Sequence, residues 1–223
     1  MFMSIRENLS KLELNNAKLV AVTKGVPAKT ILESVSYGVT DIAENYVQEA
    51  EEKFKHIGRK VKWHFIGHLQ RNKVSQAVRL FDVIQTVDSL RLAKKINRAA
   101  EHQEKIIKVM IQVNVSGDKH GVEPEHVRMF YNELTGLRHL EVIGLMCIAD
   151  IENPRLSFKR MSNLNSKLKL PYLSMGMSND YKTALEEGSN MVRLGTAIYG
   201  KRNKGFLEQI VGDIADFFRE VFS

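Results

Sequence analysis

The stretch Leu19-Val20-Ala21-Val22-Thr23-Lys24-Gly25-Val26-Pro27 indicates what kind of fold this chain adopts. Its first five residues are mostly apolar and β-branched and predict a buried strand, and the Gly-x-Pro after Lys24 predicts the end of that strand and the start of a helix. Lys24 is unusual at this position, because burial would remove water from its ammonium group. The lysine either extends its amine to the rim of a sheet or serves as a nucleophile that forms a Schiff base with an aldehyde.

Strand patterns and helix patterns alternate from this stretch to the C-terminus. Short apolar runs predict eight strands, at residues 19–23, 41–43, 62–66, 83–86, 106–115, 142–148, 172–175 and 191–194. Helix candidates follow them, most clearly at residues 27–37, 89–102, 123–134 and 179–187. This alternation requires a parallel sheet with helical crossovers, and eight units fit a closed barrel better than an open sheet. We therefore predict an α/β protein with a single (β/α)8 TIM barrel.

Helix patterns also occur near both ends of the sequence. Ile5, Leu9 and Leu12 recur at helical spacing and predict an extra N-terminal helix over residues of about 4–16, and residues 206–218 predict a last outer helix. No linker rich in proline, glycine or serine interrupts the chain. Residues 1–223 are therefore expected to form one domain.

The composition limits the class of protein. Of the 223 residues, 43% are hydrophobic and 26% are charged, which is typical of a soluble globular protein. Charged residues occur close to the N-terminus, which argues against a signal peptide. No apolar run approaches the roughly 18 residues that cross a membrane, so we expect a cytoplasmic protein with no membrane partner. Cys147 is the only cysteine, which excludes an intrachain disulfide and a cysteine cage for a metal. We interpret it as a small buried residue and not as a nucleophile.

The net charge of +7 raises the question of nucleic-acid binding. Basic residues do gather, for example at Lys53 and Lys55, but Glu49, Glu51 and Glu52 lie among them. No recognised nucleic-acid motif accompanies the charge. We interpret these residues as a solvated helix face and expect no specific nucleic-acid partner; non-specific binding of RNA through charge alone is the remaining alternative.

Histidines offer one possible metal site. His64 and His68 are four residues apart, a spacing that holds zinc when both lie on a helix. Here they fall on a predicted strand end and the loop after it, and no third ligand is apparent from the sequence. His120, after the fifth predicted strand, is interpreted as a surface-loop residue. No metal site is therefore predicted.

The loops after the seventh and eighth predicted strands contain small and polar residues. In barrels of this type the active face lies at the C-terminal ends of the strands, and these two loops commonly hold phosphate. Ser178 offers a hydroxyl to a phosphate or caps a helix, Gly195 and Thr196 offer N–H and hydroxyl groups, and Arg193 stands at the strand end. Each loop alone is also ordinary turn chemistry. Together with Lys24 they predict a site for a phosphorylated aldehyde.

Five motifs carry a resemblance to a known family. They are Ala21-Val22-Thr23-Lys24, Glu44-Asn45-Tyr46-Val47-Gln48-Glu49, Trp63-His64-Phe65-Ile66-Gly67-His68-Leu69-Gln70-Arg71-Asn72-Lys73, Ser174-Met175-Gly176-Met177-Ser178-Asn179-Asp180 and Arg193-Leu194-Gly195-Thr196. In order and spacing they resemble the pyridoxal phosphate homeostasis protein family. That family is a single barrel similar to the N-terminal domain of alanine racemase, the third fold type among proteins that bind pyridoxal phosphate (PLP).

The resemblance implies a role for each matching residue. Lys24 would hold PLP as a Schiff base, Arg193 would face the pyridine nitrogen, and Asn45 would lie beside the ring. The phosphate would be bound by Ser178, Gly195 and Thr196. The implied function is a PLP carrier or buffer in PLP homeostasis, which exchanges PLP with amino acids or with PLP-dependent apo-enzymes. Nothing in the sequence demands a dimer, and we expect a monomer.

Catalysis is not expected from this arrangement. An arginine at the ring nitrogen disfavours its protonation and makes the ring a poorer electron sink. A racemase also needs acid–base groups on both faces of its substrate, and in alanine racemase the second group is a tyrosine associated with an additional C-terminal domain, for which we expect no room here. A PLP-dependent amino-acid racemase-like enzyme is the alternative. Gly25 departs from the family pattern and is expected to loosen the site beside Lys24.

Overall fold

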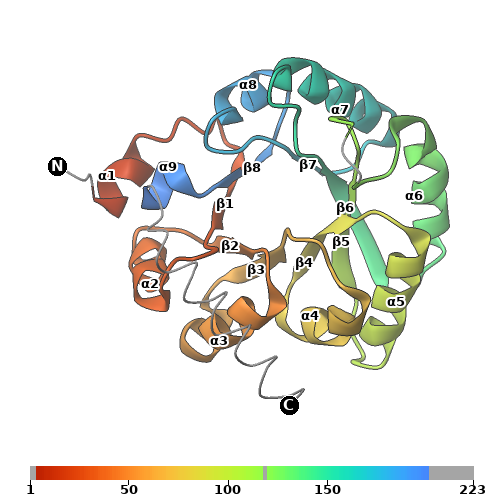
Figure 1. Ribbon diagram of the computed structural model, residues 1–223, viewed down its shortest axis with the longest axis horizontal. Coiled ribbons are helices and arrows are strands. Elements are labelled where there is room, and N and C mark those ends of the chain that lie inside the picture. Colours follow the sequence, from red (N-terminus) through yellow and green to blue (C-terminus); the bar gives the residue numbers. More distant parts are fainter. Residues whose placement is uncertain (1–3, 118–119, 201–223) are drawn as a thin grey trace, which may run out of the picture.

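The strands of the protein form a closed, eight-stranded parallel barrel. A computed structural model describes residues 4–117 and 120–200, and in it each strand pairs with its neighbours in sequence while β1 pairs with β8 to close the ring (Figure 1). The strands are β1 (Lys18–Val22), β2 (Asp41–Glu44), β3 (Lys62–Phe65), β4 (Val83–Val87), β5 (Ile107–Gln112), β6 (Leu140–Met146), β7 (Tyr172–Ser174) and β8 (Met191–Leu194). The predicted (β/α)8 barrel is confirmed.

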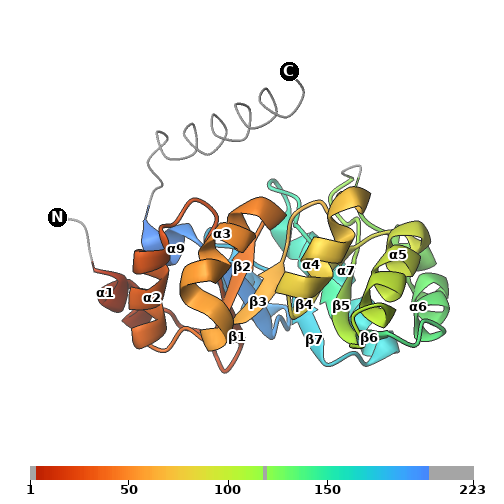
Figure 2. The same ribbon diagram turned by 90° about the horizontal axis from the view of Figure 1, so that it is seen from below.

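Helices follow the strands and surround the barrel, as Figures 1 and 2 show from two directions. They are α2 (Ala28–Ser36), α3 (Val47–Ile57), α4 (Val74–Leu80), α5 (Leu90–Glu101), α6 (Val127–Thr135), α7 (Pro154–Leu168), α8 (Tyr181–Glu186) and α9 (Thr196–Tyr199). Three short 3₁₀ helices, at Gly58–Lys60, Arg71–Lys73 and Pro124–His126, complete the connections. The outer helix predicted at residues 206–218 lies outside the described residues. Among those that are described, no helix has the length and apolar character needed to cross a membrane.

The N-terminal helix is shorter than predicted and ends at residue 10 instead of residue 16. It comprises α1 (Ile5–Ser10) and begins with a capping box, in which the Glu7 N–H donates to Ser4 Oγ and the Ser4 N–H donates to the Glu7 carboxylate. Asn15 and Asn16 have φ angles of 47° and 67°. A right-handed helix cannot continue through that left-handed region, so the apolar spacing alone overestimated its length.

The core has one layer outside the barrel wall and one inside it. β2, β4 and β8 are buried at every position, as expected where helices cover a parallel barrel. α5 packs on the wall through one face, whose buried residues are Leu92, Ala93, Ile96 and Ala100. A second, smaller apolar cluster fills the inside of the barrel and comprises Val20, Ala43, Val83, Met110, Ile143, Met146 and Met191.

A chain of hydrogen bonds also crosses the inside of the barrel. Arg193 Nη1 donates to Ser174 Oγ at 2.8 Å, and Ser174 Oγ donates to Gln85 Oε1 at 2.7 Å. Gln85 Nε2 donates to His64 Nδ1 at 2.8 Å. His64 Nε2 therefore carries the ring proton and donates it to Asp41 Oδ1 at 2.9 Å. All donors point the same way, so a buried cation at one end faces a buried carboxylate at the other.

Asp41 ends this chain at the first residue of β2. It also accepts from Thr40 Oγ1 at 2.8 Å and lies 3.1 Å from the Lys18 ammonium. Burial alone would raise the pKa of Asp41, but its interactions with His64, Thr40 and Lys18 outweigh burial and lower that pKa to about 2. His64 is thus occupied inside the barrel and does not pair with His68, so the zinc pair considered from the sequence does not form.

The substitution Asp41→Asn tests the contribution of this carboxylate to stability. Because the pKa of Asp41 is lower in the folded protein, its contribution is present above its ordinary pKa of about 4 and is lost as the pH falls toward 2. The difference in unfolding free energy between the native protein and Asp41→Asn should therefore shrink by about 1 kcal/mol between pH 5 and pH 3. Urea unfolding at both pH values measures it. Glu52→Gln, in an exposed ion pair with Lys55, is the control and should show no such change; a constant difference for Asp41→Asn would contradict the assignment.

Candidate functional site

A cleft of about 600 Å³ opens at the C-terminal ends of the strands. Its apolar wall includes Val22, Ile66 and Met146, which come from β1, the loop after β3 and β6. All six residues predicted for the cofactor site line this one cleft: Lys24, Asn45, Ser178, Arg193, Gly195 and Thr196. The fold thus brings together residues that follow the first strand and residues that follow the last, which lie far apart in the sequence.

Lys24 follows the end of β1 and is partly buried in the cleft wall. Its ammonium lies 5.8 Å from the centre of the Tyr46 ring, within cation–π distance. In the described part of the chain, no carboxylate or other hydrogen-bond partner engages this ammonium. An amine without an ion-pair partner is available to react with a group bound in the cleft.

The backbone that presents Lys24 is held from below by a second, buried lysine. Lys53 Nζ donates to the Thr23 carbonyl at 2.6 Å, to Glu44 Oε1 at 2.7 Å and to Glu49 Oε1 at 2.6 Å. Thr23 Oγ1 donates to Glu44 Oε1 at 2.6 Å, and the Gly25 N–H donates to Glu49 Oε1 at 2.6 Å. The residues on both sides of Lys24 are therefore tied to the same buried cluster.

Gly25, which was expected to loosen the site beside Lys24, occupies a turn with a specific conformation. Its φ angle is 71°, in the left-handed region that glycine adopts without steric cost. A side chain at this position would strain the turn, and the N–H of Gly25 is held by Glu49. The departure from the family pattern thus accompanies a tightly held turn.

The buried cluster has two carboxylates for one ammonium. Burial raises the pKa of Glu44 to about 7; the Lys53 ammonium opposes this rise, and the neighbouring Glu49 carboxylate adds to it. Glu44 Oε2 and Glu49 Oε2 are buried and have no hydrogen-bond partner among the described residues. A proton on Glu44 near neutral pH relieves the repulsion between the two carboxylates.

Lys53 and Glu49 were predicted to lie on a solvated helix face, and that prediction is wrong. Both are 7% exposed, because this face of α3 packs beneath the end of β1. Their spacing of four residues on a helix was the available signal. The exposed pair of Glu52 and Lys55 has a similar pattern, so spacing alone could not tell the buried pair from the solvated one.

Arg193 forms part of the floor of the cleft and is 3% exposed. Its Nη1 donates to the Ser174 carbonyl and Oγ, both at 2.8 Å, and its Nη2 donates to the Cys147 carbonyl at 2.7 Å. All three acceptors are neutral. Burial lowers the pKa of Arg193 from its ordinary value, yet an arginine remains charged at neutral pH. The cleft therefore has a fixed positive charge at its base.

Ser178 joins the loops after β7 and β8. Its Oγ accepts from the Gly195 N–H at 3.2 Å and from the Ala197 N–H at 3.1 Å. It does not cap α8, as one reading of the sequence proposed, because the N-cap of that helix is Asp180. The Ser178 hydroxyl therefore lies where two backbone donors converge, at the rim of the cleft.

Cys147 is fully buried, and burial raises the pKa of its thiol to about 12. A thiol with so high a pKa is not a nucleophile at neutral pH. The interpretation of Cys147 as a small buried residue is confirmed.

The fold and the cleft define a barrel protein with a free amine at the end of its first strand and polar loops after its last two. The family described as alanine racemase, N-terminal domain, matches residues 3–203. Among curated proteins, the pyridoxal phosphate homeostasis proteins of Pasteurella multocida and Haemophilus influenzae are 35% and 38% identical to the chain. The matches cover 90% and 85% of this chain and 99% and 86% of those proteins. The chain therefore belongs to the pyridoxal phosphate homeostasis protein family, a branch of the alanine racemase N-terminal domain family.

Solved structures agree with this assignment. PipY of Synechococcus elongatus, determined with PLP bound, is 33% identical and has a TM-score of 0.80, and the match covers 88% of this chain and all of PipY. An alanine racemase of Clostridium difficile has a TM-score of 0.74 at 20% identity, over 89% of this chain and 56% of that protein. The second similarity concerns the fold alone.

The buried cluster beneath Lys24 makes a prediction about stability. Lys53→Met leaves two buried carboxylates without a cation and should lower the unfolding free energy by about 3 kcal/mol or more. Lys55→Met removes an exposed lysine two positions away, and its effect should stay within about 0.5 kcal/mol. Chemical unfolding of both variants measures the difference. Equal effects would mean that the Lys53 ammonium does not stabilise this part of the fold.

Proposed function

We propose that the chain binds PLP in this cleft through Lys24 and acts in PLP homeostasis as a carrier or buffer. One observation carries the proposal: an unpaired lysine amine and a buried, fixed positive charge line the same cleft as the polar loops after β7 and β8. The names of the curated relatives and the PLP bound to PipY support the choice of this cofactor.

The residues of the cleft fit PLP in charge and in chemistry. PLP supplies an aldehyde, which condenses with a primary amine to form an imine and release water. Lys24 presents that amine from a turn fixed by Glu49 and Lys53. We assign the phosphate to Ser178, Gly195 and Thr196, the pyridine nitrogen to Arg193, and a position beside the ring to Asn45.

We further propose that binding occurs without catalytic turnover. The Arg193 guanidinium is held by three neutral acceptors and keeps its charge, so a pyridine nitrogen beside it would stay unprotonated. An unprotonated ring withdraws electrons weakly and stabilises a substrate carbanion poorly. Arg193 therefore favours binding of the cofactor without catalytic turnover.

Release would follow the same chemistry in reverse. Lys24 is only partly buried, so an incoming amine could reach the PLP carbon bonded to Lys24 and take its place, which would free the Lys24 amine. We propose free amino acids and lysines of PLP-dependent apo-enzymes as the recipients. We also propose that the chain acts as a monomer in the cytoplasm, where its single cysteine stays reduced.

The substitution Lys24→Ala tests the attachment site. The native protein mixed with PLP should gain an absorbance band near the boundary of the visible and ultraviolet ranges, and borohydride should then fix the PLP mass on the peptide that contains Lys24. Lys24→Ala should lose the band and the labelled peptide. Lys29→Ala, an exposed lysine on α2, should keep both. If Lys24→Ala retains the full band, the proposed attachment site is wrong.

Exchange of the α-proton of amino acids with deuterium tests the proposed lack of turnover. The PLP-loaded protein, incubated in heavy water with a panel of L- and D-amino acids, should exchange this proton no faster than free PLP does. Proton NMR follows the exchange. Rapid exchange that disappears in Lys24→Ala would establish an enzyme in place of a carrier.

A further inference from the structure

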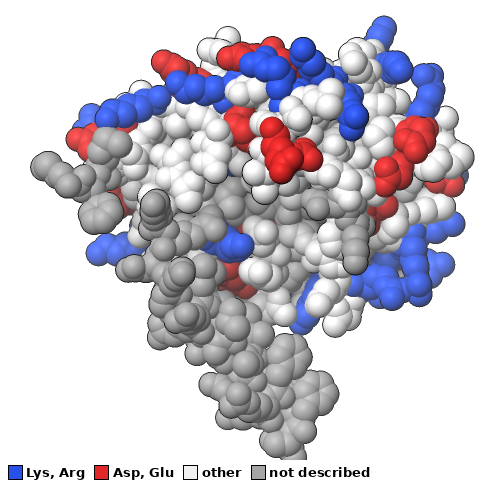
Figure 3. Space-filling view, turned by 45° about the horizontal axis from the view of Figure 1, so that its top comes forward, with Lys and Arg blue, Asp and Glu red and all other residues white. Residues whose placement is uncertain are grey.

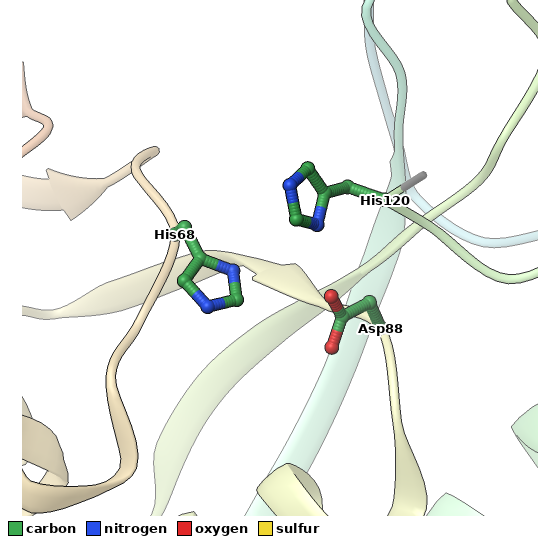
Figure 4. Close-up of side chains that lie close together, drawn as sticks. All are labelled: His68, Asp88 and His120. Atoms are coloured by element: carbon green, nitrogen blue, oxygen red, sulfur yellow. The ribbon is translucent and has the colours of Figure 1, made fainter. Parts of the chain in front are cut away.

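Two histidines and one aspartate converge at the mouth of the barrel, beside the cofactor cleft. His68 follows β3, Asp88 follows β4, and His120 lies in the loop after β5 (Figure 4). One ligand atom from each side chain lies within 4.8 Å of the other two. The two imidazole rings are 5.0 Å apart between centres and are tilted by 40°. The sequence suggested no third ligand for His68, because these residues meet only when the three loops are brought together.

Among the described residues, the polar atoms of these three side chains have no other hydrogen-bond or ion-pair partner. His64, in contrast, has a hydrogen bond on each ring nitrogen. Over residues 4–117 and 120–200, no hydrogen bond or ion pair engages the Asp88 carboxylate or the imidazoles of His68 and His120. Asp88 is only partly exposed. A half-buried carboxylate and two imidazoles thus offer three ligand atoms to a cation.

Hydrogen bonds anchor the loops that carry His68 and His120. The Gly67 carbonyl accepts from Thr86 Oγ1 at 2.7 Å, which ties the loop of His68 to β4 just before Asp88. The loop of His120 is closed at its neck by two backbone bonds, from the Asn114 N–H to the Val122 carbonyl at 2.9 Å and from the Val122 N–H to the Gln112 carbonyl at 2.8 Å. The loops of His68 and His120 are therefore anchored to neighbouring strands close to the three ligand atoms.

Two imidazole nitrogens and one carboxylate oxygen are a ligand set of zinc and of other divalent transition metals. With metal–ligand distances of about 2.0–2.1 Å, tetrahedral ligands lie about 3.4 Å from one another. The observed separation of up to 4.8 Å must therefore close by roughly 1 Å or slightly more. His68 and His120 are exposed and can rotate toward Asp88 without displacing packed neighbours.

We propose that His68, Asp88 and His120 bind a divalent transition-metal ion, zinc in the first instance, at the mouth of the barrel. Three protein ligands leave one position of a tetrahedral ion open. A groove of about 1440 Å³ adjoins the site, and His68 and Asp88 line it. The groove also carries Arg71, Arg91, Lys94, Lys95 and Arg98. The open position therefore takes water or an anionic oxygen drawn in by these cations.

Metal titration of the whole chain tests this proposal. The protein, freed of metal with a chelator and left without PLP, is titrated with Zn²⁺ against a chromogenic competitor and with Co²⁺, whose visible spectrum reports the ligand geometry. One ion should bind per chain, and the Co²⁺ spectrum should be that of a four- or five-coordinate ion. His68→Ala, Asp88→Asn and His120→Ala should each weaken Zn²⁺ binding by at least about tenfold.

Two controls separate this site from other sources of metal binding. His126→Ala removes an exposed histidine outside the cluster and should leave the affinity unchanged. Lys24→Ala alters the cofactor cleft and should also leave it unchanged, so the result is independent of the proposed function. Circular dichroism checks that each variant is folded. Failure of the native protein to bind Zn²⁺, or binding that survives the loss of His68, would overturn the proposal, as would loss of binding in Lys24→Ala.

Discussion

Burial of the Lys53 ammonium beneath the end of β1 is the constraint on which the cleft depends. A buried charge must be paired, and the available partners are a carboxylate at the end of β2, another on α3 and the backbone carbonyl of Thr23. Meeting that requirement fixes three elements against one another. The two lysines therefore differ: Lys53 pairs with the buried carboxylates, whereas Lys24 has no ion-pair partner within residues 4–117 and 120–200. The position proposed to react with PLP is thus separate from the residue that carries the structural charge.

A second constraint acts across the barrel. Arg193 has no carboxylate among its hydrogen-bond partners, and its charge is instead met by the aligned dipoles of Ser174, Gln85 and His64. Asp41 ends that alignment with a negative charge. Because each donor in the series satisfies one acceptor, the interior tolerates polar groups that would otherwise be costly. The positive charge of Arg193 at the base of the cleft is thereby stabilised by a carboxylate at the opposite end of the barrel. The outer surface differs, because Lys and Arg are mixed there with Asp and Glu on the face that Figure 3 shows.

Features that follow from the order of elements along the chain could be predicted from the sequence. Features that depend on the direction in which a side chain points could not. The alternation of strand and helix patterns predicted the barrel. The positions of the strand ends predicted that Lys24 and the loops carrying Ser178 and Gly195 lie on one face of it. Lys53 was misplaced because a glutamate and a lysine at helical spacing look alike on either face of a helix. The grouping of His68 with Asp88 and His120 was not predicted, because these residues stand on three different loops and no local spacing connects them. A barrel brings residues from several loops together at one end. A site that is formed by more than one loop can therefore be recognised only in the structure.

Gly67 links the two sites at the mouth. A Cβ atom at this position would lie 2.0 Å from the Asn45 carbonyl oxygen, so the loop after β3 passes against the backbone of a residue that lines the cofactor cleft. The next residue is His68, on the side of the proposed metal site. The close approach of the two backbones therefore requires glycine at this position. An ion held by His68 and a cofactor held beside Asn45 would therefore be bound by adjacent segments of backbone, and any energetic coupling between them must be reciprocal.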